Sequence, residues 1–210
     1  MPDKITNPHD KFVKETFSHP KRAAAVFEKF LPEEVRSELD FSTLQVANES
    51  YIQSDLSQYL SDIVFHVNTI GEEPIDLALL FEHKSNPDKY TLIQVGHYLF
   101  SHWIKCRERN APVRPIIPVI YYQGKEKWHV PQLGKLFPGL PSTLGEYIPT
   151  LRHIFIALNT LSDEAILNLK ISALAAALLT QKRRFDPFTL AEELKKIFSL
   201  LAQSREDRNF

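Results

Sequence analysis

The chain contains few of the residues that mark several common classes of protein. It holds one cysteine, Cys106, which excludes an internal disulfide and a four-cysteine zinc site and favours a reducing, cytoplasmic setting. Its six glycines form no phosphate-binding loop, so an NTPase or dinucleotide enzyme is disfavoured and no nucleotide cofactor is expected. The eight histidines include no His-x-x-x-His pair, and no serine lies within Gly-x-Ser-x-Gly. Zinc-hydrolase and serine-hydrolase chemistry are therefore disfavoured.

Long hydrophobic runs and a strong net charge are also missing. No stretch of 18 apolar residues exists, so we expect no membrane span, and the most apolar helical segment, near residues 171–179, is expected in the core. The N-terminal residues lack the apolar segment of a secretory signal, so none is expected. The formal net charge is −1, which argues against a uniformly basic nucleic-acid-binding protein.

The sequence does have the composition of a folded protein. Apolar residues make up 43% of its 210 residues, enough for a core and too many for a disordered chain. We predict a single domain over residues 1–210, with a core at about 8–130 and a C-terminal strand and helical part at about 150–205.

Hydrophobic periodicity predicts alternating helices and strands. The expected helices cover residues 9–17, a segment starting at Pro20, a short one at Pro32, and then 88–109, 162–182 and 187–202. The expected strands cover residues 43–52, 61–68, 75–84, 116–122 and 151–158, and residues 128–147 are expected to form a loop with short turns. Pro118 predicts an edge or a bulge at that point of its strand. This order predicts an α/β fold with a mixed central sheet flanked by helices.

Three charged residues stand out in the strands around the segment Gly71-Glu-Glu-Pro74, which predicts a hairpin turn. An antiparallel hairpin can bring Asp62, near the start of one strand, opposite Glu82, near the end of the next. Lys84 would share a face with Glu82, because alternate side chains of a strand point the same way. Two carboxylates beside an ammonium group can hold a hard divalent cation and orient its bound water. A structural ion pair at a strand end is the alternative.

The charge distribution is uneven along the chain. Residues 61–100 contain six acidic and two basic residues, a balance of −4, whereas residues 101–130 contain two acidic and six basic ones, a balance of +4. This pattern suits a metal pocket beside a surface that follows phosphates, although chance clustering on a solvated surface would look the same.

Several short motifs, taken in order, resemble a known family. They are His9-Asp10-Lys-Phe-Val-Lys-Glu-Thr-Phe17, Phe30-Leu-Pro32, Leu80-Phe-Glu-His-Lys-Ser85, Gln94-Val-Gly-His-Tyr98 and Pro115-Ile-Ile-Pro-Val-Ile-Tyr-Tyr-Gln-Gly124. The set is similar to the Rpn family of recombination-promoting nucleases, also described as YhgA-like transposases, and it covers roughly residues 8–130. The Asp…Glu-x-Lys pattern resembles the signature of the PD-(D/E)XK nuclease superfamily.

This resemblance implies a PD-(D/E)XK, or restriction-endonuclease-like, core and a Mg²⁺-dependent DNA endonuclease, with Mn²⁺ as a possible substitute. In that pattern Asp62, Glu82 and Lys84 take the catalytic positions, with Asp62 and Glu82 as metal ligands. Asp10 falls where the family has an acidic residue near the site, and Gln94 falls where related nucleases have a supporting polar residue. A helix N-terminal charge is an equal alternative for Asp10, and a position at the edge of the core is one for Gln94.

We expect an endonuclease of low sequence specificity, linked to recombination or to mobile-element or phage-related DNA processing, because no recognition helix or zinc module is evident. Four basic residues are candidates for holding the DNA backbone: Arg107, Arg109, Lys125 and Lys127. Cleavage of both strands usually requires two sites, which favours a homodimer. Two alternatives remain: a catalytically inactive DNA-binding or regulatory protein on the same scaffold, and a purely structural or interaction domain.

Overall fold

The computed structural model describes residues 12, 15–47, 60–82 and 87–203. Phe12 and residues 15–17 are helical, which agrees with the first expected helix as far as it is described. The further helices are α2 (Pro20–Phe30), α3 (Glu33–Arg36), α4 (Thr91–Glu108), α5 (Ser142–Gly145), α6 (Asp163–Leu167), α7 (Ser172–Arg183) and α8 (Pro187–Gln203), with 3-10 turns η1 (Leu133–Leu136) and η2 (Leu158–Thr160). The strands are β1 (Leu39–Val46), β2 (Leu60–Thr69), β3 (Pro74–Glu82), β4 (Ile116–Tyr122) and β5 (Ile154–Ala157). None of these described helices is long and apolar enough to cross a membrane.

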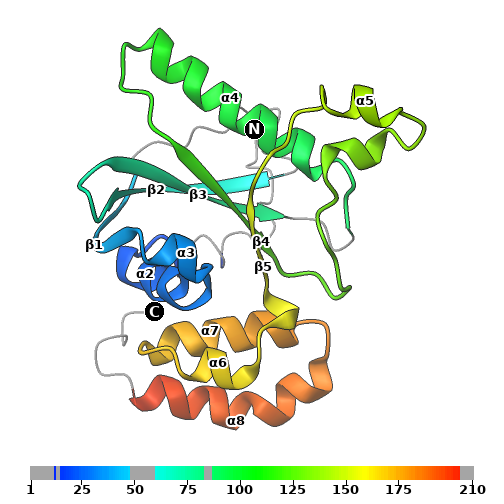
Figure 1. Cartoon of the computed structure of the whole chain (residues 1–210). Coiled ribbons are helices and arrows are strands. Elements are labelled where there is room, and N and C mark those ends of the chain that lie inside the picture. The colour runs from blue at the N-terminus through cyan, green and yellow to red at the C-terminus, as the bar shows by residue number, and fades with distance from the viewer. Residues whose placement is uncertain (1–11, 13–14, 48–59, 83–86, 204–210) are drawn as a thin grey trace, which may run out of the picture.

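A five-stranded mixed sheet forms the middle layer of the fold, in the order β1-β2-β3-β4-β5. Strand β2 runs antiparallel to both β1 and β3, whereas β4 runs parallel to both β3 and β5. Helix α4 covers one face, and the other carries α2 and α3 with the group α6–α8 (Figure 1). The predicted α/β fold with a mixed sheet and flanking helices is confirmed.

Strands β2 and β3 form the predicted antiparallel hairpin, closed by residues 70–73. Leu77 and Leu79 pack against the α2 and α7 side of the sheet, while Ala78 and Leu80 pack against α4. All four side chains are fully buried. Covering on both faces explains why β3 has an almost continuous apolar sequence instead of an alternating one.

The segment from β3 through α4 to β4 is a crossover between neighbouring parallel strands, which is the usual way to join such strands. The buried face of α4 includes Leu92, Val95 and Leu99, as the helical periodicity predicts. Strand β4 has the predicted bounds. It pairs with β3 from Ile116 onward, but its pairing with β5 starts only at Val119, so Pro118 has a strand partner on one side only. The expected edge character of Pro118 is thus local, and β4 as a whole lies inside the sheet.

Several expected elements differ in their bounds. The strand expected over residues 151–158 is limited to β5 (Ile154–Ala157), and the helix expected from residue 88 begins at Thr91. The helix expected over residues 162–182 is broken into α6 and α7, and Leu169 in the break is buried in the main core. Packing of this side chain therefore interrupts a pattern that reads as continuous in the sequence. The Ser162 hydroxyl accepts a hydrogen bond from the Ala165 amide, so Ser162 is the N-cap of α6.

The strand expected over residues 43–52 starts earlier, as β1, because pairing with β2 already begins at Leu39 opposite Thr69. Residues 48–52 of the expected strand lie outside the described residues. The register then shifts between Asp40 and Gln45, where the Asp40 carboxylate accepts hydrogen bonds from Ser42. Such an irregularity locally disrupts the pairing of β1 with β2.

Candidate functional site at the carboxyl edge of the sheet

The three parallel strands end in one row. Glu82 of β3 lies opposite Tyr122 of β4, and Tyr122 lies opposite Ala157 of β5. In open α/β sheets, ligands bind outside the carboxyl ends of the parallel strands, where loops and helix N-termini converge. This edge, which includes the candidate Glu82, is therefore the expected location of a functional site.

The register of the hairpin relates Asp62 to Glu82. Asp62 is paired with Leu80, and Glu82 is paired with Leu60, so Asp62 lies diagonal to Glu82 and not directly opposite it as expected. Positions 62, 80 and 82 belong to the same face of the sheet, because paired residues share a face and alternate residues of one strand do too. Diagonal neighbours of this kind are within reach of long side chains. The backbone thus places the two acidic positions one pair apart on one face.

Two further candidates, Lys84 and Asp10, lie outside the described residues. Glu82 is the last residue of β3, so Lys84 follows the end of the strand by two positions. The expectation that Lys84 shares a face with Glu82 stays a prediction, as does a place for Asp10 near the site.

Gln94 lies near the start of α4, on the helix that covers this face. Its neighbours Leu92 and Val95 pack in the same cluster as Leu80, two residues before Glu82. The Gln94 side chain is half-buried, and its Nε2 donates to Asp88 Oδ2 at 3.4 Å. The Asp88 backbone oxygen accepts from the Thr91 hydroxyl at 2.9 Å, which anchors the first turn of α4. The Gln94 Oε1 atom is buried without a hydrogen-bond partner among the described residues. Asp88 was not among the predicted site residues, although an acidic residue just before a helix is a common N-terminal signal.

The four candidate DNA-backbone residues divide into two groups. Lys125 and Lys127 are exposed and follow the carboxyl end of β4, next to Tyr122 and so beside the row that includes Glu82. Arg107 and Arg109 are exposed at the opposite end of α4 from Gln94. An 18-residue helix is roughly 27 Å long, so the structure brings only the two lysines to the carboxyl edge.

A second polar cluster, which the sequence analysis missed, lies at the other end of the hairpin. The Asp76 carboxylate is 2% exposed, and its Oδ1 lies 2.6 Å from His66 Nδ1 and 3.7 Å from Arg114 Nη1. His102 Nε2 of α4 lies 3.6 Å from Oδ2. The signal was present in the sequence. Asp76 lies two and four residues before Ala78 and Leu80, so all three share one face of the strand, and a carboxylate buried on that face needs polar partners.

This cluster connects β2, β3, α4 and the segment before β4. It is at the amino end of the parallel strands, away from the carboxyl edge. Within the part of the chain that the structure describes, no three His, Cys, Asp or Glu side chains are placed to hold a metal ion. Because the buried Asp76 carboxylate contacts side chains from three other segments, we assign the cluster a structural role.

Comparison with known proteins was informative at the level of sequence. A family model described as "Putative transposase, YhgA-like" matches residues 7–209. Three proteins of Escherichia coli K12 are similar to this chain. The first, recombination-promoting nuclease RpnC, is 30% identical over 57% of this chain and 40% of its own length. RpnA, also named a recombination-promoting nuclease, is 23% identical over 92% of this chain and 66% of its own. The inactive recombination-promoting nuclease-like protein RpnE is 21% identical over 98% of this chain and 73% of its own. No solved structure matches.

Proposed function

The chain belongs to the YhgA-like transposase family, and from this premise we propose that it is a metal-dependent DNA endonuclease with a PD-(D/E)XK core. The single observation that supports this most is the register of the hairpin. It places two acidic positions, Asp62 and Glu82, on one sheet face at the edge where parallel strands end. Relatives named recombination-promoting nucleases support a role in recombination.

The donor set fits a hard divalent cation such as Mg²⁺, with Mn²⁺ as a substitute. Carboxylate oxygens are the ligands that these ions prefer, and Asp62 and Glu82 would hold the ion. When bound, the ion would neutralise charge on the phosphoryl oxygens and make a water molecule a better nucleophile near neutral pH. The chain's own residues then have to orient that water and bind the DNA.

We assign these tasks to nearby residues. Lys84, two residues after Glu82, would orient the water and stabilise developing charge on the scissile phosphate. Gln94 would support the site through its half-buried amide at the start of α4, with Asp10 assisting. Lys125 and Lys127 would hold the DNA backbone at the same edge. Contacts to the backbone carry no sequence information, so specificity should be low. Cleavage of both strands would use a homodimer.

A second candidate is a catalytically inactive DNA-binding protein on the same scaffold. The match to RpnE, a protein named inactive, extends over 98% of this chain, more than the match to RpnC or RpnA. Under this alternative the protein binds DNA in the presence of Mg²⁺ or Mn²⁺ and leaves it intact.

Nicking of supercoiled plasmid tests the proposal. We expect cleavage that requires Mg²⁺ or Mn²⁺ and stops with EDTA, and a loss of at least about a hundredfold in Asp62→Asn, Glu82→Gln and Lys84→Ala. Glu73→Gln is the matched control, because Glu73 is an exposed carboxylate in the turn of the same hairpin. Circular dichroism would verify that each variant is folded. Cleavage by folded Asp62→Asn or Glu82→Gln at the wild-type rate would refute the catalytic assignment, and DNA binding without cleavage by the wild type would favour the inactive alternative.

A further inference from the structure

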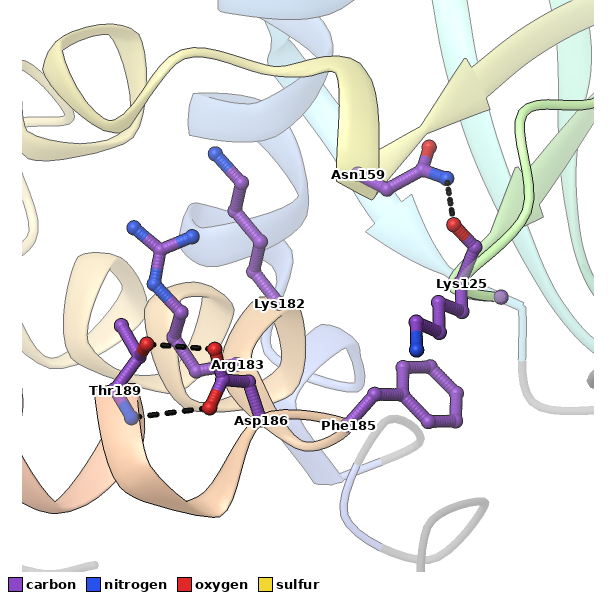
Figure 2. Close-up of a pocket in the computed structure, with 8 residues that line it drawn as sticks. Lys125, Asn159, Lys182, Arg183, Phe185, Asp186 and Thr189 are labelled. Carbon is purple, nitrogen blue, oxygen red and sulfur yellow. Dashed lines mark hydrogen bonds between the residues drawn. The ribbon is translucent and has the colours of Figure 1, made fainter.

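A cavity of about 490 Å³ opens where the carboxyl edge of the sheet meets the C-terminal helices (Figure 2). This volume is within the range of pockets that bind small molecules or parts of larger ligands. The residues that line it come from the segment after β4, from η2, and from the junction between α7 and α8. They include Gly124, Lys125, Asn159, Lys182, Arg183 and Phe185.

The cavity begins at the carboxyl end of β4, next to the strand that carries Glu82. Glu82 is paired with Tyr122, and the lining residues Gly124 and Lys125 follow Tyr122 directly in the chain. Neighbouring strands are roughly 4.8 Å apart and each residue adds about 3.3 Å along a strand. The cavity therefore begins roughly 10 Å from the end of β3. It lies on the α7–α8 side of the sheet, whereas positions 62 and 82 share the face that α4 covers, so a strand that reaches both has to pass around the carboxyl edge.

One wall of the cavity is held in place by partly buried ion pairs. Lys182 Nζ donates to Asp163 Oδ1 at 2.5 Å, and Arg183 pairs with both Asp163 and Glu193. The hydrogen bond to Glu193 raises the pKa of the Arg183 guanidinium above its ordinary value. Lys182 and Arg183 are thus occupied in joining α6, α7 and α8, and they form a fixed polar surface.

The opposite wall presents the ring of Phe185 and the exposed side chain of Lys125. The Phe185 side chain is 38% exposed, and the Arg184 guanidinium lies 4.3 Å from its ring centroid. Figure 2 shows the Lys125 side chain extending toward the same ring. The backbone of this loop is fixed, since Asn159 Nδ2 donates to the oxygens of Lys125 and Glu126 at 3.2 and 2.9 Å. Lys125 has no ion-pair partner among the described residues.

We propose that this cavity binds one nucleotide of the DNA strand that continues around the carboxyl edge from the scissile bond, with the base stacked on Phe185 and a phosphate held by Lys125. The combination of an aromatic platform with basic side chains is how proteins bind single strands without reading their sequence. The Asp186 carboxylate on the rim repels phosphate, so the phosphate is placed on the Lys125 side. The proposal rests on the proposed nuclease function for the identity of the strand.

Binding measurements in EDTA test the site without requiring catalysis. The probe is a short fluorescent single-stranded DNA, followed by anisotropy at about 50 mM salt, where phosphate contacts are strong. Phe185→Ala should weaken binding about tenfold, and Phe185→Tyr, which keeps an aromatic ring, should restore it. The control is Phe188→Ala, because Phe188 is 84% exposed on α8 and does not line the cavity. An effect of Phe185→Ala no larger than that of Phe188→Ala would overturn the proposal.

The charge contact has a separate signature. Loss of one phosphate contact reduces the slope of log affinity against log salt by about 0.7 for a single strand. Lys125→Ala should show this reduction, whereas Lys170→Ala, at the opposite end of α7 and exposed, should not. An unchanged slope in Lys125→Ala would remove the phosphate from this site.

Photocrosslinking locates the strand directly and separates this proposal from the nuclease assignment. A strand carrying 5-iododeoxyuridine should crosslink to Phe185 in the wild type and in Asp62→Asn. Crosslinks that map elsewhere refute the cavity even if the plasmid is cut, whereas a crosslink at Phe185 supports it even if no cleavage occurs. Equal affinity for a free deoxynucleoside monophosphate and for the strand would instead identify a small-molecule site and overturn the proposal.

Discussion

Replacement of Asp76 by Asn tests the structural role of the cluster at the turn end of the hairpin. The change removes a charge that is 2% exposed and leaves His66, His102 and Arg114 without their common partner. Removing one partner of a buried ion pair typically costs about 3–5 kcal/mol. The side chains of His66 and Arg114 are 37% and 32% exposed and regain water, so only His102, at 3%, stays buried. We therefore expect the lower end, about 3 kcal/mol.

Urea unfolding measures this loss. With a slope of about 2 kcal/mol per molar urea for a chain of this size, the midpoint should fall by about 1.5 M at an unchanged slope. Tryptophan fluorescence is a suitable probe, because Trp103 Nε1 donates to the Arg114 backbone oxygen at 2.9 Å and so reports on the cluster. The matched control is Glu73→Gln, an exposed carboxylate three residues before Asp76, which should change stability by less than about 0.5 kcal/mol.

The same variant separates stability from catalysis. Asp76 and Glu82 are six residues apart on β3, about 20 Å along an extended strand. Folded Asp76→Asn should therefore nick plasmid at close to the wild-type rate at low temperature and lose activity on heating before the wild type does. A midpoint shift no larger than that of Glu73→Gln would refute the structural role, and a folded but inactive variant would place Asp76 in the catalytic machinery.

Two further changes test the cavity wall and the start of α8. Gly124→Ala should destabilise the protein by about 1–3 kcal/mol in urea unfolding, because a Cβ there would lie 2.0 Å from the hydroxyl of the fully buried Tyr122; wild-type stability would show that the ring can move aside. Asp186→Ala should lower the melting temperature at neutral pH, because the Thr189 hydroxyl and amide donate to the Asp186 carboxylate and hold its pKa below the ordinary 3.8. A carboxylate whose pKa is lowered in the folded state stabilises the fold at pH values above its ordinary pKa, and this stabilisation is lost as the pH falls through the folded-state pKa. The difference in melting temperature between wild type and Asp186→Ala should therefore vanish in acid. A difference that persists in acid would refute the assignment to the charge.

Much of the fold was predictable because its signals are local. The β2–β3 hairpin follows from two apolar segments around a Pro- and Gly-containing turn, and α4 follows from helical periodicity. The failures have non-local causes. The break between α6 and α7 depends on the burial of Leu169, and the position of β1 depends on pairing with β2. The hydrophobic periodicity of a single segment cannot predict either contact, because both depend on residues far away in the chain.

The sequence alone determined which residues carry the proposed chemistry and the family to which the chain belongs, since residue types and motif order are properties of the chain itself. The tertiary structure decided what lies beside what. It aligned Glu82 with the ends of β4 and β5, placed Asp62 on the diagonal, and assembled the Asp76 cluster and the Phe185 cavity from distant segments. Strand register and helix docking arise from packing between residues far apart in the chain, and such packing exists only after folding.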